Sequence, residues 1–138
     1  MKLHHIGIVV KSIQESLGEL TKFLEFKETS VPIGVKSQKV NVCFLKTSDI
    51  YVELIEPIGN DSPVKKLSES GGGFHHLCFE VEDVVKELEN MKNNGARIIV
   101  EPTKGFEDRI IAFVLLNMKN TNCNLIELVG MRNKNVRK

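Results

Sequence analysis

The amino-acid sequence predicts an α+β fold in which two tandem βαβββ modules form one curved mixed sheet. Three observations lead to this prediction: a strand-like segment that follows a pair of histidines twice, an amphipathic helix after each copy, and a strand with a central glutamate at the end of each half. The 138 residues have the size of one domain. Within it we expect modules at about residues 1–58 and 72–130, a linker helix at about 62–70 and a tail at 131–138.

The first element of each module is the repeated strand. A His-His pair begins the stretch at residues 4–10, and a second pair begins the stretch at residues 75–81. His76 lies 71 residues after His5, which is about half the chain. Both stretches alternate apolar side chains with other residues, as a strand with one buried face does.

The second element of each module is a helix with a side-chain cap. Ser12 and Asp83 each stand directly before an amphipathic stretch, where a short polar side chain can accept a hydrogen bond from the first turn. The expected apolar faces comprise Ile13, Leu17, Leu20 and Leu24 in the first helix and Val84, Leu88 and Met91 in the second. Asn94 and Gly95 then provide a stop for the second helix.

Strands follow both helices, and a joint separates the halves. Apolar and β-branched stretches predict strands at residues 40–45 and 50–55 in the first half, and at 110–116 and 125–129 in the second. A short helix opening at Ser62-Pro63, with Val64 and Leu67 on one side, is expected to bridge the halves, and the three glycines at 71–73 form the joint.

Composition excludes several classes of partner. Nineteen basic and eighteen acidic residues give a net charge of +1, so no broad cationic surface attracts nucleic acid or anionic lipid. No apolar run reaches the roughly 20 residues that span a bilayer, and no signal-peptide pattern is found. The three cysteines have no CxxC spacing and are expected to be structural thiols, with Cys78 the one to examine further. We therefore expect a cytoplasmic protein whose partner is a small molecule.

Strand alternation places four polar side chains on the faces that carry no helix. If Ile6 and Ile8 face the helix, His5 points the other way, and the same reasoning applies to three further strands. The four residues are His5, Glu53, His76 and Glu127. If the modules join into one curved sheet, these side chains converge in its concavity.

Two imidazoles and two carboxylates in one cleft are a metal site by composition. A strand histidine or glutamate taken alone is usually a satisfied or solvated residue, but a repeat that places the same types at the same positions twice favours ligands. The nitrogen and oxygen donors suit divalent Co, Ni, Mn, Zn or Fe without choosing among them. An octahedral ion would keep two positions open and could polarise a carbonyl group.

At these residues the sequence resembles the vicinal oxygen chelate (glyoxalase/bleomycin resistance/dioxygenase) superfamily, from Leu3 to about Val129. Within it the chain is most similar to the methylmalonyl-CoA epimerase family, and next to bacterial glyoxalase I. The stretches that carry the similarity are VELIEPIGNDSPVKKL at 52–67, GGGFHHLCFEVEDV at 71–84 and LIELV at 125–129. The resemblance implies paired βαβββ modules around one divalent metal ion, bound by the same four residues. Extradiol dioxygenases need only three ligands, so the fourth ligand, Glu53, argues against them.

The resemblance implies an isomerase or lyase that removes a proton next to a carbonyl through a metal-stabilised enolate. An epimerase returns the proton to the opposite face of the same carbon, whereas lactoylglutathione lyase returns it to the neighbouring carbon. The partner is then an acyl thioester or a hemithioacetal. Under this hypothesis Glu127 is the principal ligand and base, and Glu53 is the partner on the opposite face.

Three segments depart from the epimerase pattern. The strand at 39–45 lacks the acid that some epimerases have there, and its nearest polar side chain is Asn41. Residues 118–124 replace a glycine-rich turn, and residues 104–114 contain Glu107, Asp108 and Arg109 where the family has a glycine-rich substrate loop. Arg109 either binds an anionic group of the substrate or is a surface charge of a hairpin.

A different class of function stays open, because members of this superfamily also bind a drug or ligand without catalysis. In that case the two modules form a cleft for an apolar or planar molecule. We also expect a homodimer, since small proteins of this kind commonly assemble, and the site lies within one chain or is shared between two.

Overall fold

The computed structural model describes residues 1–132, which contain nine strands and three α-helices. The first half comprises β1 (Lys2–Val9), α1 (Ile13–Leu20), β2 (Glu28–Thr29), β3 (Ile33–Val35), β4 (Val40–Lys46), β5 (Tyr51–Pro57) and α2 (Lys65–Glu69). The second half comprises β6 (Gly73–Val81), α3 (Val84–Asn93), β7 (Arg97–Lys104), β8 (Ile110–Leu115) and β9 (Leu125–Gly130). Apart from its first two residues, the tail expected at 131–138 lies outside the described residues.

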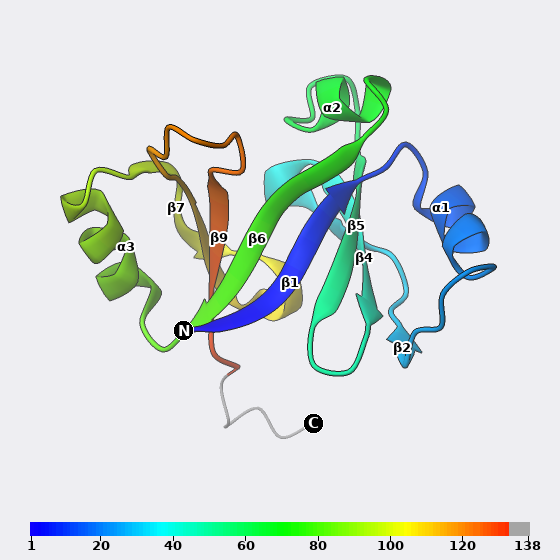
Figure 1. The fold of residues 1–138 in the computed structure, drawn as a ribbon, viewed down its shortest axis with the longest axis horizontal. Coiled ribbons are helices and arrows are strands. Elements are labelled where there is room, and N and C mark those ends of the chain that lie inside the picture. Colours follow the sequence, from blue (N-terminus) through cyan, green and yellow to red (C-terminus); the bar gives the residue numbers. More distant parts are fainter. Residues whose placement is uncertain (133–138) are drawn as a thin grey trace. The chain divides into compact units, whose positions relative to one another are not determined.

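The chain divides into two compact units. One unit is His5–His75, and the other contains Met1–His4 together with the chain from His76 onward. Each unit contains a strand, a helix and further strands in the expected order, with β2 and β3 as short additions in the first (Figure 1). The α+β class with two βαβββ modules is therefore confirmed.

The unit of residues 5–75 buries apolar side chains on both faces of its sheet. Its strands follow the order β2-β4-β5-β1, β3 pairs with β4, and β1 runs parallel to β5. Helix α1 covers one face through Ile13, which packs with Leu54 and Leu45. The opposite face is covered by the segment around α2, where Val64 and Leu67 pack against the side chains of Val9, Val40, Val42 and Ile55.

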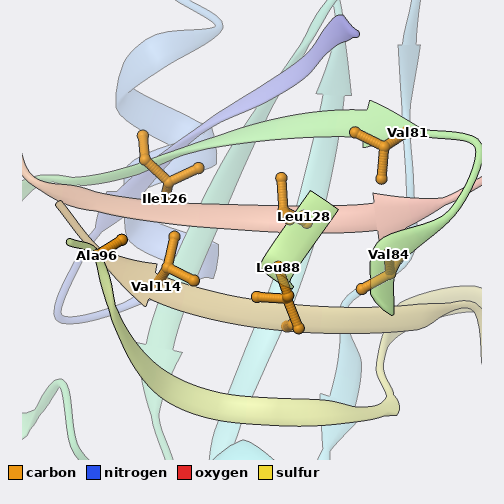
Figure 2. Packing of buried hydrophobic residues seen from close by; sticks show 8 residues of the cluster. Val81, Val84, Leu88, Ala96, Val114, Ile126 and Leu128 are labelled. Atoms are coloured by element: carbon orange, nitrogen blue, oxygen red, sulfur yellow. The ribbon is translucent and has the colours of Figure 1, made fainter. Parts of the chain in front are cut away.

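The second unit has one helix on one face of a four-stranded arrangement. Its strands follow the order β6-β9-β8-β7, with β6 parallel to β9 and antiparallel pairs beyond. Helix α3 packs on this face through Val84 and Leu88 (Figure 2). The strand side chains that meet it are Val81, Ala112, Val114, Ile126 and Leu128. This alternation leaves His76 and Glu127 on the face that α3 does not cover.

Both predicted helix caps are confirmed. The Ser12 side chain accepts a hydrogen bond from the Glu15 amide at 3.1 Å, and Asp83 accepts one from the Lys86 amide at 3.1 Å. Helix α3 ends at Asn93, as the Asn-Gly stop predicts. The expected continuation of the first helix face to Leu24 is wrong. Helix α1 ends at Leu20, where the Thr21 hydroxyl donates to the carbonyl of Leu17, and Leu24 lies beyond the helix, half exposed.

The linker helix is shorter than predicted, because it begins at Lys65 instead of Ser62-Pro63. Ser62 makes no side-chain cap, and its backbone carbonyl accepts from the Lys65 amide instead. The glycine joint has positive φ at all three positions, 71 to 73. A Cβ at Gly72 would lie 2.3 Å from the Val9 carbonyl oxygen, so only glycine fits where the chain passes this strand.

The four strands predicted after the two helices correspond to β4, β5, β8 and β9, each within two residues of its expected ends. Three others, β2, β3 and β7, have no residue range in the prediction, because β2 and β3 are very short and β7 contains charged residues and Pro102. Among the described residues, no helix has both the length and the apolar character that crossing a membrane requires.

Within the described residues, none of the three cysteines forms a disulfide bond. Cys43 and Cys78 are buried and Cys123 is exposed. Burial raises the pKa of the Cys43 thiol, although its hydrogen bond with Ser30 acts in the opposite direction. A raised pKa keeps this thiol protonated and unreactive, as expected of a structural cysteine.

Candidate functional site

The first pair of polar site residues is His5 with Glu53. His5 lies on β1 and Glu53 on the neighbouring parallel strand β5, where Glu53 stands opposite Gly7, two residues after the histidine. Their side chains approach with 3.3 Å between His5 Nε2 and Glu53 Oε1. Ile8 of β1 and Leu54 of β5 pack on the α1 side, so strand alternation turns this pair toward the opposite face.

An aromatic side chain borders this pair. Phe44 on β4 stands opposite Glu53 in the antiparallel register. Its ring meets the His5 imidazole edge to face, with 5.3 Å between the ring centroids. Tyr51 continues the row, with its ring centroid 5.8 Å from that of Phe44. The apolar ring limits access of water to the imidazole and helps to fix its orientation.

The second pair is His76 with Glu127, and it repeats the arrangement of the first. Glu127 on β9 stands opposite Cys78, again two residues after the histidine on the neighbouring parallel strand β6. His76 Nε2 lies 3.0 Å from Glu127 Oε1. Phe113 on β8 stands opposite Glu127, and its ring meets the His76 ring edge to face at 5.3 Å.

Each unit therefore contains the same trio of histidine, glutamate and phenylalanine. The four polar residues are those that strand alternation selects, whereas Phe44 and Phe113 are absent from the sequence-based set. A signal for them exists in the sequence, because Phe113 lies 69 residues after Phe44, close to the offset between the histidines. Large aromatic residues in strands are so often core residues that this spacing alone did not distinguish them.

Each pair has the chemistry and the spacing of two ligands of one metal ion. A histidine and a glutamate in each pair offer donor atoms. Ligand atoms about 2.1 Å from an ion and at right angles to each other lie about 3.0 Å apart. The observed 3.3 Å and 3.0 Å match this spacing. None of the four residues is more than 5% exposed, and such buried polar groups need a partner or an ion.

Arg109 has partners within its own unit. It is only 6% exposed, so the interpretation as a surface charge of a hairpin is wrong. Its Nε–H donates to the carbonyl oxygen of Gly130 at 2.8 Å, and its terminal nitrogen donates to a carboxylate oxygen of Glu80. Its guanidinium also lies over the ring of Phe106, 5.7 Å from the centroid. Binding of a substrate anion by Arg109 stays a prediction.

Asn41 and Glu53 lie on opposite faces of the sheet. Its side-chain amide donates to Glu56 at 3.3 Å, and the other oxygen of Glu56 accepts from the backbone of Ile13 at the start of α1. Asn41 and Glu56 therefore lie on the α1 side of the sheet. The residues of β4 that alternate onto the Glu53 face are Val40, Val42, Phe44 and Lys46, so this strand contributes no acid beside Glu53.

The chain was compared with known proteins. Residues 4–113 match the model of the Glyoxalase/Bleomycin resistance protein/Dioxygenase superfamily. Because the match covers more than half of the chain, this protein belongs to that superfamily. The resemblance predicted from the histidine and glutamate motifs is thus confirmed.

Among the relatives within this superfamily are methylmalonyl-CoA epimerases. The chain is 30% identical over 131 residues to an ethylmalonyl-CoA/methylmalonyl-CoA epimerase of Cereibacter sphaeroides, covering 92% of this chain and 96% of the relative. It is 30% identical over 129 residues to a mitochondrial methylmalonyl-CoA epimerase of Dictyostelium discoideum, covering 92% and 76%.

A solved structure agrees with these relatives. A Streptomyces coelicolor methylmalonyl-CoA epimerase variant, in complex with 2-nitronate-propionyl-CoA, superposes with a TM-score of 0.81 at 28% identity, covering 96% of this chain and 99% of that chain. These epimerases are enzymes, and they lend no support to the lyase alternative.

Proposed function

We propose that this protein is an epimerase of acyl-CoA thioesters, most like methylmalonyl-CoA epimerase. It would remove the proton from the carbon next to the thioester carbonyl and return a proton to the opposite face of that carbon. The observation that carries the proposal is the matched pair of buried histidine and glutamate side chains in a chain whose relatives are epimerases. An epimerisation needs proton-handling groups on two faces of one carbon, and a duplicated pair supplies them.

The proposal includes one divalent metal ion, Co, Ni, Mn or Zn, held jointly by His5, Glu53, His76 and Glu127. The spacing of donor atoms within each pair supports this ligand set. When bound, the ion would polarise the thioester carbonyl and stabilise the negative charge that develops on its oxygen. A set of nitrogen and oxygen donors without thiolate fits all four metals.

The two glutamates are the proposed proton-transfer groups. A carboxylate has two oxygens, so Glu127 can use one as a ligand and the other to hold a proton. Glu53 occupies the equivalent position of the other pair, and it is the proposed partner for the opposite face. General acid-base catalysis by such groups contributes roughly a hundredfold to ten-thousandfold. Phe44 and Phe113 support this chemistry, because their rings shield the imidazoles from water.

The deciding experiment follows hydrogen exchange at the reacting carbon. Protein loaded with each metal in turn is incubated with methylmalonyl-CoA in deuterated water, and deuterium at the α-carbon is measured by mass spectrometry. Uptake together with interconversion of the two epimers supports the proposal. Thioester formation from methylglyoxal and glutathione in a parallel reaction, without exchange in the first, would establish the lyase instead.

The same preparation tests the alternative of a binding protein without catalysis. Calorimetric titration with methylmalonyl-CoA measures thioester binding, and elemental analysis of protein purified without chelator measures metal. Thioester binding without exchange by the metal-loaded protein would contradict the enzyme proposal. Size-exclusion chromatography with light scattering on this sample tests the homodimer, which is also part of the proposal.

A further inference from the structure

The turn between β7 and β8 has a strained backbone. Glu107 and Asp108 have φ values of 55° and 56°, in the left-handed region that side chains other than glycine rarely adopt. The turn is closed by the Gly105 amide, which donates to the Arg109 carbonyl at 2.8 Å, and by the Arg109 amide, which donates to the Phe106 carbonyl at 3.0 Å. Because such a backbone persists only when its surroundings hold it, contacts elsewhere must stabilise this turn.

Arg109 supplies contacts of this kind at the end of the turn. Its guanidinium joins the turn to β6 through Glu80 and to the last residue of β9 through the Gly130 carbonyl. Glu80 lies four residues after His76 on the same face of β6, and Gly130 lies three residues after Glu127 on β9. One side chain therefore connects the turn with both strands that contain this His–Glu pair.

In the other unit, the positions that correspond to Glu80 and Arg109 have a different role. Glu80 lies 71 residues after Val9, the offset of the two site histidines, and Arg109 lies 69 residues after Val40, the offset of the two site phenylalanines. Val9 and Val40 are both buried in the apolar cluster beneath α2. The corresponding position of the first unit therefore serves packing.

We infer that Arg109 is a positioning residue of the second unit, with Glu80 as its partner, and that it does not bind the anionic group of a substrate. This inference rests on the proposed function for its catalytic consequence. The ion pair holds the strained turn and the ends of β6 and β9, and so maintains the register of the strands that contain His76 and Glu127. The Glu80 carboxylate already neutralises the guanidinium, so a substrate anion would have to displace it.

Steady-state kinetics separate the two roles of Arg109. If it is a positioning residue, Arg109→Met and Glu80→Gln each lower kcat for epimerisation about tenfold and change KM less than about twofold, because small displacements of catalytic groups reduce the rate steeply. The double variant is then no worse than the more damaged single variant. If Arg109 binds substrate, Arg109→Met raises KM strongly, whereas Glu80→Gln leaves KM unchanged or lowers it. That result would overturn the inference.

Amide hydrogen exchange tests the same role without relying on activity. In both single variants we expect faster exchange in a peptide covering residues 105–109 and in one covering the end of β9, with unchanged exchange in α3. Arg109→Lys, which keeps the charge near Glu80 but loses the Nε–H donor to Gly130, should give an intermediate rate. Unchanged exchange at the turn in both variants would contradict the inference even if the protein proves not to be an epimerase.

Matched controls come from the exposed side of β7. Arg97→Met and Glu101→Gln remove the same charges from exposed positions of the same unit. Both should leave the kinetics and the exchange pattern unchanged. If Arg97→Met has the same effect as Arg109→Met, loss of net charge explains both results and the positioning role is wrong.

Discussion

The two units contain the same site residues but differ at the neighbouring position of the strands. In each unit a glutamate stands opposite the residue two places after a histidine, and a phenylalanine stands opposite that glutamate. Beyond this trio, the first unit buries Val9 and Val40 beneath α2, and the second pairs Glu80 with Arg109. The repeat therefore keeps the trio of histidine, glutamate and phenylalanine, whereas the residues beside it differ between the units.

The largest effect is expected from removing the carboxylate charge of each pair. We predict that Glu127→Gln lowers the epimerisation rate by roughly a thousandfold to ten-thousandfold, and Glu53→Gln by about a hundredfold, because Glu127 is the proposed principal base. Initial rates at saturating metal and substrate measure both, with Glu101→Gln as the control. Equal losses for the two variants would show that the pairs act symmetrically.

The next largest effect concerns the two apolar cores. Leu88 of the second unit lies on α3 and packs against the strands, and Leu54 of the first lies on β5 beneath α1; both are buried. Replacing either by alanine should lower the free energy of unfolding by about 2–5 kcal/mol, through lost burial and the cavity left behind. Urea unfolding followed by circular dichroism measures the change. A second transition in one variant only would show that the units unfold separately.

Metal titration tests whether the two His–Glu pairs bind one ion together or one ion each. If all four side chains bind one ion, the protein takes up one equivalent, and both His5→Ala and His76→Ala weaken its binding. At a free concentration one hundred times the Kd, the ion should raise the free energy of unfolding by about 2.7 kcal/mol. Calorimetry and thermal unfolding with and without chelator measure these quantities. Two equivalents, each lost in only one variant, would mean that each pair is a separate site.

The smallest expected effect compares the two helix caps. Ser12→Ala and Asp83→Ala each remove a side-chain acceptor from a helix N-terminus. We expect each to lower the free energy of unfolding by about 1 kcal/mol, because one amide of the first turn loses its partner. Ser12→Asp, which keeps an acceptor, should restore stability. A loss several times larger in one unit would indicate that its helix depends on the cap for more than this bond.

Much of this fold follows from local rules that can be applied directly to the sequence. Ser12 and Asp83 cap the predicted helices because a short polar side chain before an amphipathic stretch satisfies the first-turn amides wherever it occurs. Alternation along the strands places His5 on the face away from α1, and Glu127 on the face away from α3, for the same kind of reason. Strand β7 escaped prediction because its charged residues and Pro102 obscure the alternation.

The environment of Arg109 could not be predicted from local rules. In the sequence it stands in a polar turn and is equally consistent with an exposed charge or an anion-binding residue. In the structure it is buried, because residues 29 and 21 positions away in the chain, Glu80 and Gly130, supply the acceptors that a buried guanidinium needs. No spacing rule connects these three residues, since the pairing of β8 with β9 and of β9 with β6 brings them together.

The sequence by itself determined the α+β class, the two modules, the helix caps and the four polar residues of the two pairs. These depend on periodicity and on a repeat, which are properties of the order of residues along the chain. Only the tertiary structure decided that Phe44 and Phe113 border the imidazoles and that Arg109 joins Glu80. These contacts depend on the register between strands, and backbone hydrogen bonds between distant segments set that register without leaving a pattern in either segment alone.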